Sequence, residues 1–286
     1  MGGAALGAYW RLTKPGITRL VMVTAAAGYW LGARGEPSGA ALLQTLLGSG
    51  LVISGTNGLN QWWERDADAR MRRTRARPLP SGALRPPQAL AFALTIAVLG
   101  ITWLAAFVNV LTAGLAAASL ALYILAYTPL KRRSPVALYV GAIPGALPIL
   151  GGWTAAGAPL DAAGWTLFAV LFLWQLPHFL ALGWMYRDDY RQAGFRVLSS
   201  VDPDGRLTAR QALVCSVALV VVSFVPAWVG LAGLGYLIGA AGLGLVMLGW
   251  SLVLLREPTT ARARGLFLTS VGYLPALLML LVLLPA

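Results

Sequence analysis

The chain of 286 residues is rich in apolar side chains and poor in charge. Hydrophobic residues make up 58% of it and charged residues 11%, whereas soluble domains carry about 25% charged residues. This composition excludes an ordinary soluble domain and indicates an integral membrane protein. The net charge of +12 does not indicate a nucleic-acid partner, because no soluble basic domain with interleaved aromatic residues accompanies it. In a membrane chain such charge reports topology and contact with anionic lipid.

Apolar stretches of about 20 residues, the length that crosses a bilayer as a helix, follow one another along the chain. We predict nine membrane-spanning helices in a single all-α transmembrane domain that covers residues 1–286. From Met1 to Tyr9 there is no basic start and no cleavage signal, so we expect no removable signal peptide. The expected spans are 17–34, 39–63, 87–108, 110–128, 135–156, 163–185, 211–231, 234–255 and 265–285.

The lysines and arginines fall into five groups between these spans. With nine spans, all five groups lie on one side of the membrane, and only Arg34 lies on the other. The positive-inside rule assigns that side, and with it the N-terminus, to the cytoplasm. Most acidic residues share the same side, although the rule does not require it. Carboxylates gathered with arginines at a membrane surface are what a site for a metal ion and a diphosphate requires.

A polar stripe continues from the second expected span. Its members are three or four residues apart, so on one helix they share a face. Two carboxylates one turn apart repel each other unless a cation lies between them, and carboxylate oxygens suit Mg²⁺, which also bridges substrate phosphates. The alternative is a solvated helix end whose carboxylates pair with Arg65 and Arg72. The stripe consists of Asn57, Asn60, Glu64 and Asp68.

A basic segment, residues 70–82, follows the stripe, and Pro78 and Pro80 within it disfavour a helix. Arginine binds phosphate through two N–H groups and stays charged, so this segment is suited to hold a diphosphate and to stabilise its negative charge as it leaves. Arg73 and Arg77 are the candidates for this role. The alternative is that these arginines only set the topology and bind lipid headgroups.

Two further ionisable features follow. The only histidine, His178, lies in an apolar span, where an ionisable group is a functional candidate; the alternative is a packing histidine. A second acidic pair, Asp188 and Asp189, comes after that span. Neighbouring helical residues point about 100° apart, so one of the two faces the site. We favour Asp189, which lies about three turns beyond His178 and on its face if the helix is continuous.

Four segments together resemble a known family. The runs NQWWERDAD and MRRTRARPL, within residues 60–79, are similar to the first signature of protoheme farnesyltransferases, a heme-modifying branch of the UbiA-type prenyltransferases. Segments 12–15, 127–132 and 174–179 are similar to that family's segments in the same order. The resemblance covers about residues 11–200, and the last three spans match in hydropathy alone. Glu64 stands where the family more often has aspartate.

The resemblance implies an enzyme of a bacterial-type inner membrane whose active site faces the cytoplasm. It would transfer the farnesyl chain of farnesyl diphosphate to a vinyl group of heme B, giving heme O. Its expected partners are farnesyl diphosphate, heme, membrane lipid and a downstream heme-modifying enzyme, and its expected cofactor is Mg²⁺, as one or two ions. Whether His178 ligates heme iron or forms a hydrogen bond stays open at this point.

The expected site follows from the residues and the resemblance together. The expected catalytic residues are Asn60, Glu64, Asp68 and Asp189. The expected substrate-binding residues are Asn57, Arg73, Arg77, Tyr127, Lys131, Arg132 and His178. The expected metal ligands are Glu64, Asp68, Asp188 and Asp189. A related alternative is prenylation of a quinone precursor or another aromatic acceptor, and a remote one is a porphyrin carrier or transporter.

Overall fold

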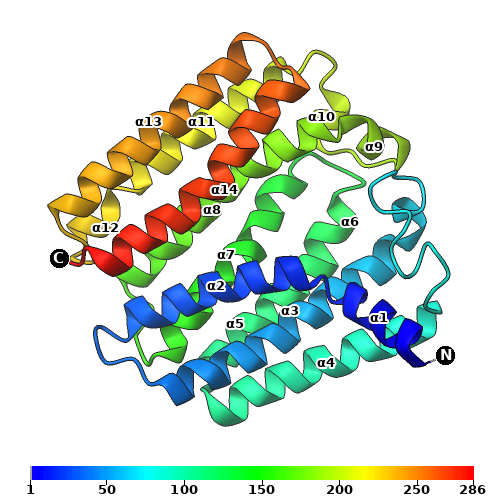
Figure 1. Cartoon of the computed structure of the whole chain (residues 1–286), viewed down its shortest axis with the longest axis horizontal. Coiled ribbons are helices and arrows are strands. Elements are labelled where there is room, and N and C mark those ends of the chain that lie inside the picture. The colour runs from blue at the N-terminus through cyan, green and yellow to red at the C-terminus, as the bar shows by residue number, and fades with distance from the viewer. Residues whose placement is uncertain (1) are drawn as a thin grey trace.

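The computed structural model describes residues 2–286 and consists of helices, with no strand among those residues (Figure 1). The predicted all-helical fold is confirmed, and Met1 lies outside the described residues. The helices of the first half are α1 (Gly2–Leu12), α2 (Pro15–Gly32), α3 (Gly39–Asp68), α4 (Pro86–Phe107), α5 (Val110–Ala121), the π-helical turn η1 (Leu122–Tyr127), α6 (Thr128–Leu130) and α7 (Ala137–Ala155). Those of the second half are α8 (Ala162–Met185), α9 (Arg187–Gln192), α10 (Leu198–Val201), α11 (Arg206–Val222), α12 (Val225–Trp228), α13 (Leu234–Arg256) and α14 (Thr260–Leu283).

Eight helical segments in residues 2–286 are long and apolar enough to cross a membrane. They are α3, α4, α5 with η1 and α6, α7, α8, α11 with α12, α13 and α14. The one expected span outside this set is the first, 17–34. It corresponds to α2, which has 18 residues. Arg19 near its start lowers its apolar character. The count of nine therefore stays a prediction, and the short helix α1 was not predicted from the sequence.

The five basic groups lie along one end of the bundle, which runs in Figure 1 from the junction of α1 and α2 at the right to the turn between α13 and α14 at the top. The backbone N–H of Arg196 donates to the carbonyl of Lys131 at 2.8 Å, and the Arg187 guanidinium donates to Thr260 at 3.2 Å. Arg34, the one basic residue expected on the opposite side, pairs instead with Asp161 at 3.3 Å. We call the end formed by the start of α2, the loop 69–85, the turn 131–136 and the segment 186–205 the charged end.

Short polar side chains fix where several helices begin. Ser38 accepts a hydrogen bond from the N–H of Ala41 at the start of α3, and Asp161 accepts one from Gly164 at the start of α8. Asn109 does the same for α5. Each such cap satisfies a free helix N–H and contributes about 1 kcal/mol. The cap residues therefore determine where these helices begin. The hydropathy of the apolar stretches alone does not determine the first residue of a helix.

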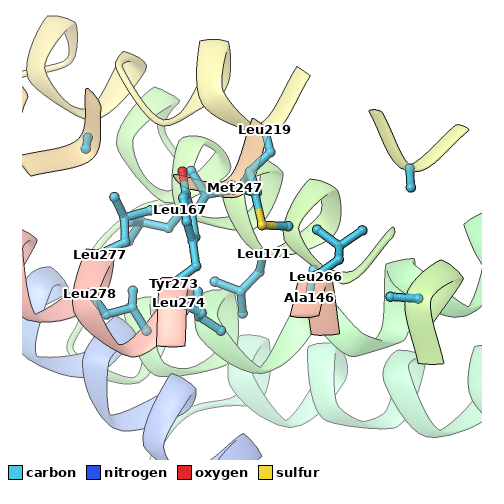
Figure 2. Packing of buried hydrophobic residues seen from close by; sticks show 14 of the residues in the cluster. Ala146, Leu167, Leu171, Leu219, Met247, Leu266, Tyr273, Leu274, Leu277 and Leu278 are labelled. Atoms are coloured by element: carbon cyan, nitrogen blue, oxygen red, sulfur yellow. The ribbon is translucent and has the colours of Figure 1, made fainter. Parts of the chain in front are cut away.

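The largest core lies where α8 packs against α7, α11 and α14 (Figure 2). Leucines dominate it, and Tyr273 is buried there with its hydroxyl 2.9 Å from the Ser223 hydroxyl. Outward-facing apolar side chains such as Val214 and Leu245 are exposed. An apolar outer surface around a bundle in which most buried polar groups have hydrogen-bond partners is what a bilayer demands. Among the exceptions in the described residues are Gln61 Oε1 and Ser199 Oγ.

Close packing of α2 on α7 depends on small residues. A Cβ added at Gly152 would come within 1.9 Å of the carbonyl oxygen of Ala25, whereas one added at the neighbouring Gly151 would meet nothing within 4 Å. We therefore expect Gly152→Ala to lower the free energy of unfolding by about 1–3 kcal/mol through overpacking. Gly151→Ala should change it by less than about 0.5 kcal/mol. Thermal unfolding of the two variants in one detergent compares them directly, and equal midpoints would contradict the close α2–α7 contact.

Candidate active site

Two carboxylates are buried at the charged end. Helix α3 continues without a break to Asp68, as the sequence predicted, so Glu64 and Asp68 lie one turn apart on its last two turns. The side chain of Asp68 is 0% exposed and that of Glu64 is 6% exposed. An ionised carboxylate is this deeply buried only when it is paired with a cation or a metal. The alternative of a solvated helix end is therefore wrong, and Arg65 pairs with the exposed Asp66 instead.

Each buried carboxylate has a cationic partner from another segment. Both Oδ atoms of Asp68 accept hydrogen bonds from Nη1 of Arg77, at 2.8 and 2.7 Å. Glu64 forms an ion pair with Lys131, which comes from the turn after α6. Burial lowers the pKa of Lys131, but the Glu64 carboxylate outweighs it and raises the pKa above the ordinary lysine value, so this side chain is charged. The ring of Tyr127 lies 4.9 Å from its ammonium group.

Lys14 is a third cation at this place. Its backbone is in the left-handed region, with φ 49° and ψ 63°, which costs a non-glycine residue about 1 kcal/mol or more. Its Nζ donates to Oδ1 of Asn60 at 3.0 Å. Burial lowers the pKa of Lys14 to about 7, and Arg77 adds to the shift, while the two carboxylates oppose it. Three cationic side chains thus face two carboxylates, an arrangement that leaves room for an anion.

The two amides of the stripe have different surroundings. Nδ2 of Asn60 donates to the Thr128 hydroxyl at 3.4 Å, so this side chain joins Lys14 to the turn that carries Lys131. Asn57 donates to the carbonyl of Thr13 and to the Thr18 hydroxyl, at 3.3 and 3.2 Å. It therefore connects α3 to the start of α2. All four members of the stripe are buried.

The second acidic pair reaches the loop that follows α3. Oδ2 of Asp189 accepts a hydrogen bond from the backbone N–H of Arg73 at 3.3 Å, and the Arg73 guanidinium lies over the ring of Tyr186 at 5.1 Å. Asp188 is exposed and forms a 3.7 Å ion pair with Arg191. The preference for Asp189 thus has a structural basis, but the argument from helical phase is wrong. Helix α8 ends at Met185 and α9 begins at Arg187, so no continuous helix joins His178 to this pair.

A cavity of about 540 Å³ extends from the charged end into the bundle. At its charged end it is lined by Lys14, Asn57 and Lys131, and farther in by apolar side chains of α2, α3, α5, α7, α8 and α14. Tyr123 and Tyr127, whose rings are 5.0 Å apart, line its wall below Lys131. The π-helical turn places both rings there, and such irregular turns often occur at functional sites. The cavity therefore joins a charged mouth to an apolar interior.

His178 lines this cavity from α8. Its ring stacks on that of Trp174 at 4.9 Å and lies 4.7 Å from that of Phe267. Its Nδ1 is 2.8 Å from the hydroxyl of Ser270 on α14. The histidine is thus held on one edge and available to a ligand on the other.

The model of the UbiA prenyltransferase family matches residues 21–280 of the chain. The chain belongs to the UbiA prenyltransferase family. It is similar to the protoheme IX farnesyltransferase of Solibacter usitatus (strain Ellin6076), with 46% identity over 93% of this chain and 94% of the relative. It is also similar to the protoheme IX farnesyltransferase of Salinibacter ruber (strain DSM 13855 / M31), with 42% identity over 96% of both chains.

Solved structures of the UbiA family share this fold. A digeranylgeranylglyceryl phosphate synthase matches with a TM-score of 0.81 at 19% identity, over 97% of both chains. A UbiA homologue from Archaeoglobus fulgidus bound to GPP and Mg²⁺ matches with a TM-score of 0.69 at 15% identity, over 96% of this chain and 99% of that one. At these identities the likeness concerns the arrangement of the helices.

In this member of the UbiA family, most of the site residues predicted from the sequence lie together at the charged end or in the cavity wall. Around the buried carboxylates or in the cavity wall lie Asn57, Asn60, Glu64, Asp68, Arg77, Tyr127, Lys131 and His178. Asp189 contacts the backbone of Arg73 on the loop that follows α3, but within residues 2–286 it does not form a group of three acidic side chains with Glu64 and Asp68. Asp188 and Arg132 are exposed, and in residues 2–286 the Arg132 side chain forms no ion pair or hydrogen bond.

Sequence reasoning missed two residues that the structure brings into the site. Lys14 lies within the segment 12–15 but is not among the expected site residues, and its left-handed backbone conformation before Pro15 is visible only in the structure. Ser270 was not singled out at all, because a lone serine in an apolar span carries no signal of its own. Lys14 lines the cavity, and Ser270 is hydrogen-bonded to His178, which lines it.

Proposed function

We propose that the protein transfers the farnesyl chain of farnesyl diphosphate to a vinyl group of heme B, giving heme O and diphosphate. The observation that carries this proposal is the 46% identity, over 93% of the chain, to a protein named protoheme IX farnesyltransferase. The site agrees in its chemistry, because buried cations at the mouth suit a diphosphate and the apolar interior suits a prenyl chain and a porphyrin.

In the proposed reaction, the bond between the allylic carbon and the diphosphate oxygen breaks, and its electron pair leaves with the diphosphate. Arg77, Lys131 and Lys14 stabilise the charge that grows there, since preorganised cations in a buried site act more strongly than in water. The ring faces of Tyr123 and Tyr127 stabilise the allylic cation. The vinyl electrons form the new carbon–carbon bond, water adds to the porphyrin-stabilised cation, and a proton is released.

The buried carboxylates fit Mg²⁺. In residues 2–286 no group of three or more acidic, histidine or cysteine side chains lies close enough to form a complete metal site. Mg²⁺ commonly uses one or two protein carboxylates and completes its shell with water and substrate phosphates. Glu64 and Asp68 would hold the ion, with Asp189 as the candidate for a second. When bound, Mg²⁺ draws electron density from the leaving diphosphate.

The active site in this proposal opens to the cytoplasm, because the charged end gathers the basic groups. Farnesyl diphosphate would enter with its charged head at Lys14 and Lys131 and its chain in the cavity. Arg73, at the rim, would act through its loop, which is hydrogen-bonded to Asp189 of α9. Arg132, exposed at the same end, would meet the diphosphate or lipid headgroups.

Labelled farnesyl diphosphate tests the acceptor. Purified protein with Mg²⁺ is given heme B or 4-hydroxybenzoate, and the products are separated by mass. We expect hydroxyethylfarnesyl heme with one diphosphate released per product, and no prenylated benzoate. Prenylated benzoate without prenylated heme would instead make the protein an aromatic-acceptor prenyltransferase. Heme binding with no diphosphate release at all would favour a carrier.

The lowered pKa of Lys14, about 7, predicts how diphosphate binding depends on pH. A bound diphosphate favours the charged ammonium and raises this pKa, so above pH 7 binding takes up a proton. The affinity should then fall as pH rises from about 7 to 9, by up to tenfold per unit. Inhibition by inorganic pyrophosphate at saturating Mg²⁺ measures this.

Lys14→Met supplies the reference, because the ionisation of pyrophosphate itself affects both proteins equally. We expect the ratio of the two inhibition constants to be largest near pH 6.5 and to approach unity near pH 9. A ratio that stays constant over this range would contradict proton uptake by Lys14.

A further inference from the structure

The environment of His178 determines which of its ring nitrogens carries the proton. The Ser270 hydroxyl is fully buried and has two oxygen or nitrogen neighbours: the carbonyl oxygen of Phe267 at 2.6 Å and Nδ1 of His178 at 2.8 Å. A hydroxyl has one proton to donate. Two oxygens 2.6 Å apart repel each other unless a proton lies between them, so the serine proton belongs to the contact with Phe267.

It follows that the Ser270 oxygen is an acceptor toward the histidine. Nδ1 of His178 must then carry a hydrogen and donate it, which makes Nε2 the unprotonated nitrogen of the neutral ring. Nδ1 is turned toward α14, and the ring lines the cavity, so the Nε2 edge is the one left for a ligand. Within residues 2–286 Nε2 has no hydrogen-bond partner.

The ring is also held against rotation. Trp174, one turn before His178 on α8, stacks on the imidazole and donates its Nε1–H to the backbone carbonyl of Ser270 at 2.7 Å. Phe267, one turn before Ser270 on α14, packs on the same imidazole. Two side chains of α8 and two residues of α14 thus interlock. A histidine whose Nδ1–H donates to a fixed acceptor while Nε2 stays free is the usual arrangement of a metal-ligating imidazole.

We propose that Ser270 is a positioning residue that holds His178 in the Nδ1–H form, so that Nε2 of His178 ligates the iron of the heme acceptor. This inference rests on the proposed function, because it takes heme as the molecule in the cavity. Of the two roles that the sequence left open for His178, it selects ligation: a nitrogen without a hydrogen cannot donate a hydrogen bond to the diphosphate, whereas its lone pair suits the iron. The iron would anchor the porphyrin beside the bound prenyl diphosphate.

Binding of heme and of metal-free protoporphyrin IX, without any prenyl diphosphate, separates ligation from simple packing. Both have the same porphyrin ring, but only heme has an iron to ligate. In the wild type we expect tighter binding of heme than of protoporphyrin IX and a heme absorption spectrum typical of histidine ligation. His178→Ala should abolish both the spectrum and the preference for heme, and added imidazole should restore the spectrum.

Ser270→Ala should weaken heme binding about tenfold or more, the usual cost of losing a partner that orients a ligand, and should leave the affinity for protoporphyrin IX unchanged. Ser251→Ala is the matched control, because Ser251 is equally buried and is paired with Ser216 between α11 and α13, where neither serine lines the cavity. It should bind both molecules as the wild type does.

Three results would overturn the inference while leaving the proposed function in place. They are wild-type heme affinity and spectrum in Ser270→Ala, equal loss of heme and protoporphyrin IX in that variant, and a histidine-ligated spectrum that persists in His178→Ala. Failure of the wild type to bind either porphyrin would instead overturn the proposed function, and the inference with it.

Discussion

Glu64→Gln and Asp68→Asn are each expected to lower kcat/KM for farnesyl transfer about 10³-fold, because each removes a charge that a divalent cation needs and metal assistance is worth several kcal/mol in the transition state. The amide replacements keep the shape of the side chains. This matters for Asp68, which is 0% exposed and accepts two hydrogen bonds from Arg77. An alanine there would leave a partly buried guanidinium unpaired, at a cost of about 3–5 kcal/mol in stability.

Asp66→Asn is the matched control for these two variants. Asp66 lies on the same turns of α3 but is exposed, and its only ion pair in the described chain is a 3.8 Å contact with Arg65. We expect its turnover to stay within a few-fold of the wild type. Turnover is measured by release of labelled diphosphate with heme as acceptor, and thermal unfolding verifies the fold. Equal losses in all three variants, or wild-type turnover in Asp68→Asn, would contradict a metal site at the end of α3.

The spacing of polar residues predicted the core of this site because it depends on a single helix. Asn57, Asn60, Glu64 and Asp68 share a face on any helix that continues to its end, and α3 does so. The partners of the carboxylates were not predictable in the same way. Lys131 is 67 positions from Glu64, and only the packing of α6 beside α3 brings the two together.

The fold was predicted to the extent that hydropathy determines it. Apolar length places α3 to α8 and α11 to α14 within a few residues, because each must cross the same thickness of lipid. Hydropathy carries less information where the chain leaves the apolar region. The break at Tyr186 depends on local backbone geometry. Gly183, the one glycine between His178 and Asp189, lies within α8, and no proline lies between these two residues. The phase argument across it was wrong for that reason.

The hydrogen bond between His178 and Ser270 is a second feature that could not be predicted from the sequence. The two residues are 92 positions apart, and each lies in a helix that hydropathy describes as merely apolar. A polar pair inside a membrane bundle is visible only when both helices are in place. The last three spans, for which the sequence analysis found a resemblance in hydropathy alone, fall almost entirely within the residues 21–280 that the family model matches. Of these spans, α14 contributes Phe267 and Leu274 to the cavity wall.

Asp189→Asn is expected to lower kcat/KM about 10²-fold, whereas Asp188→Asn should stay within a few-fold of the wild type. The two residues are adjacent, carry the same charge and are replaced by the same amide. Their surroundings differ: Asp189 accepts a hydrogen bond from the loop that carries Arg73 and Arg77, while Asp188 points to solvent beside Arg191. In the proposed site the Asp189 carboxylate would order this loop and hold a second Mg²⁺, a contribution of several kcal/mol when it is ionised.

The dependence of turnover on Mg²⁺ separates the two roles of Asp189. If its charge helps to hold a second ion, Asp189→Asn should need a higher Mg²⁺ concentration for half-maximal turnover, and excess Mg²⁺ should restore part of the rate. If the carboxylate only orders the loop, the Mg²⁺ dependence should match that of the wild type while the KM for farnesyl diphosphate rises. Larger losses in Asp188→Asn than in Asp189→Asn would contradict the placement of both side chains, because the exposed carboxylate would then be the one that the reaction needs.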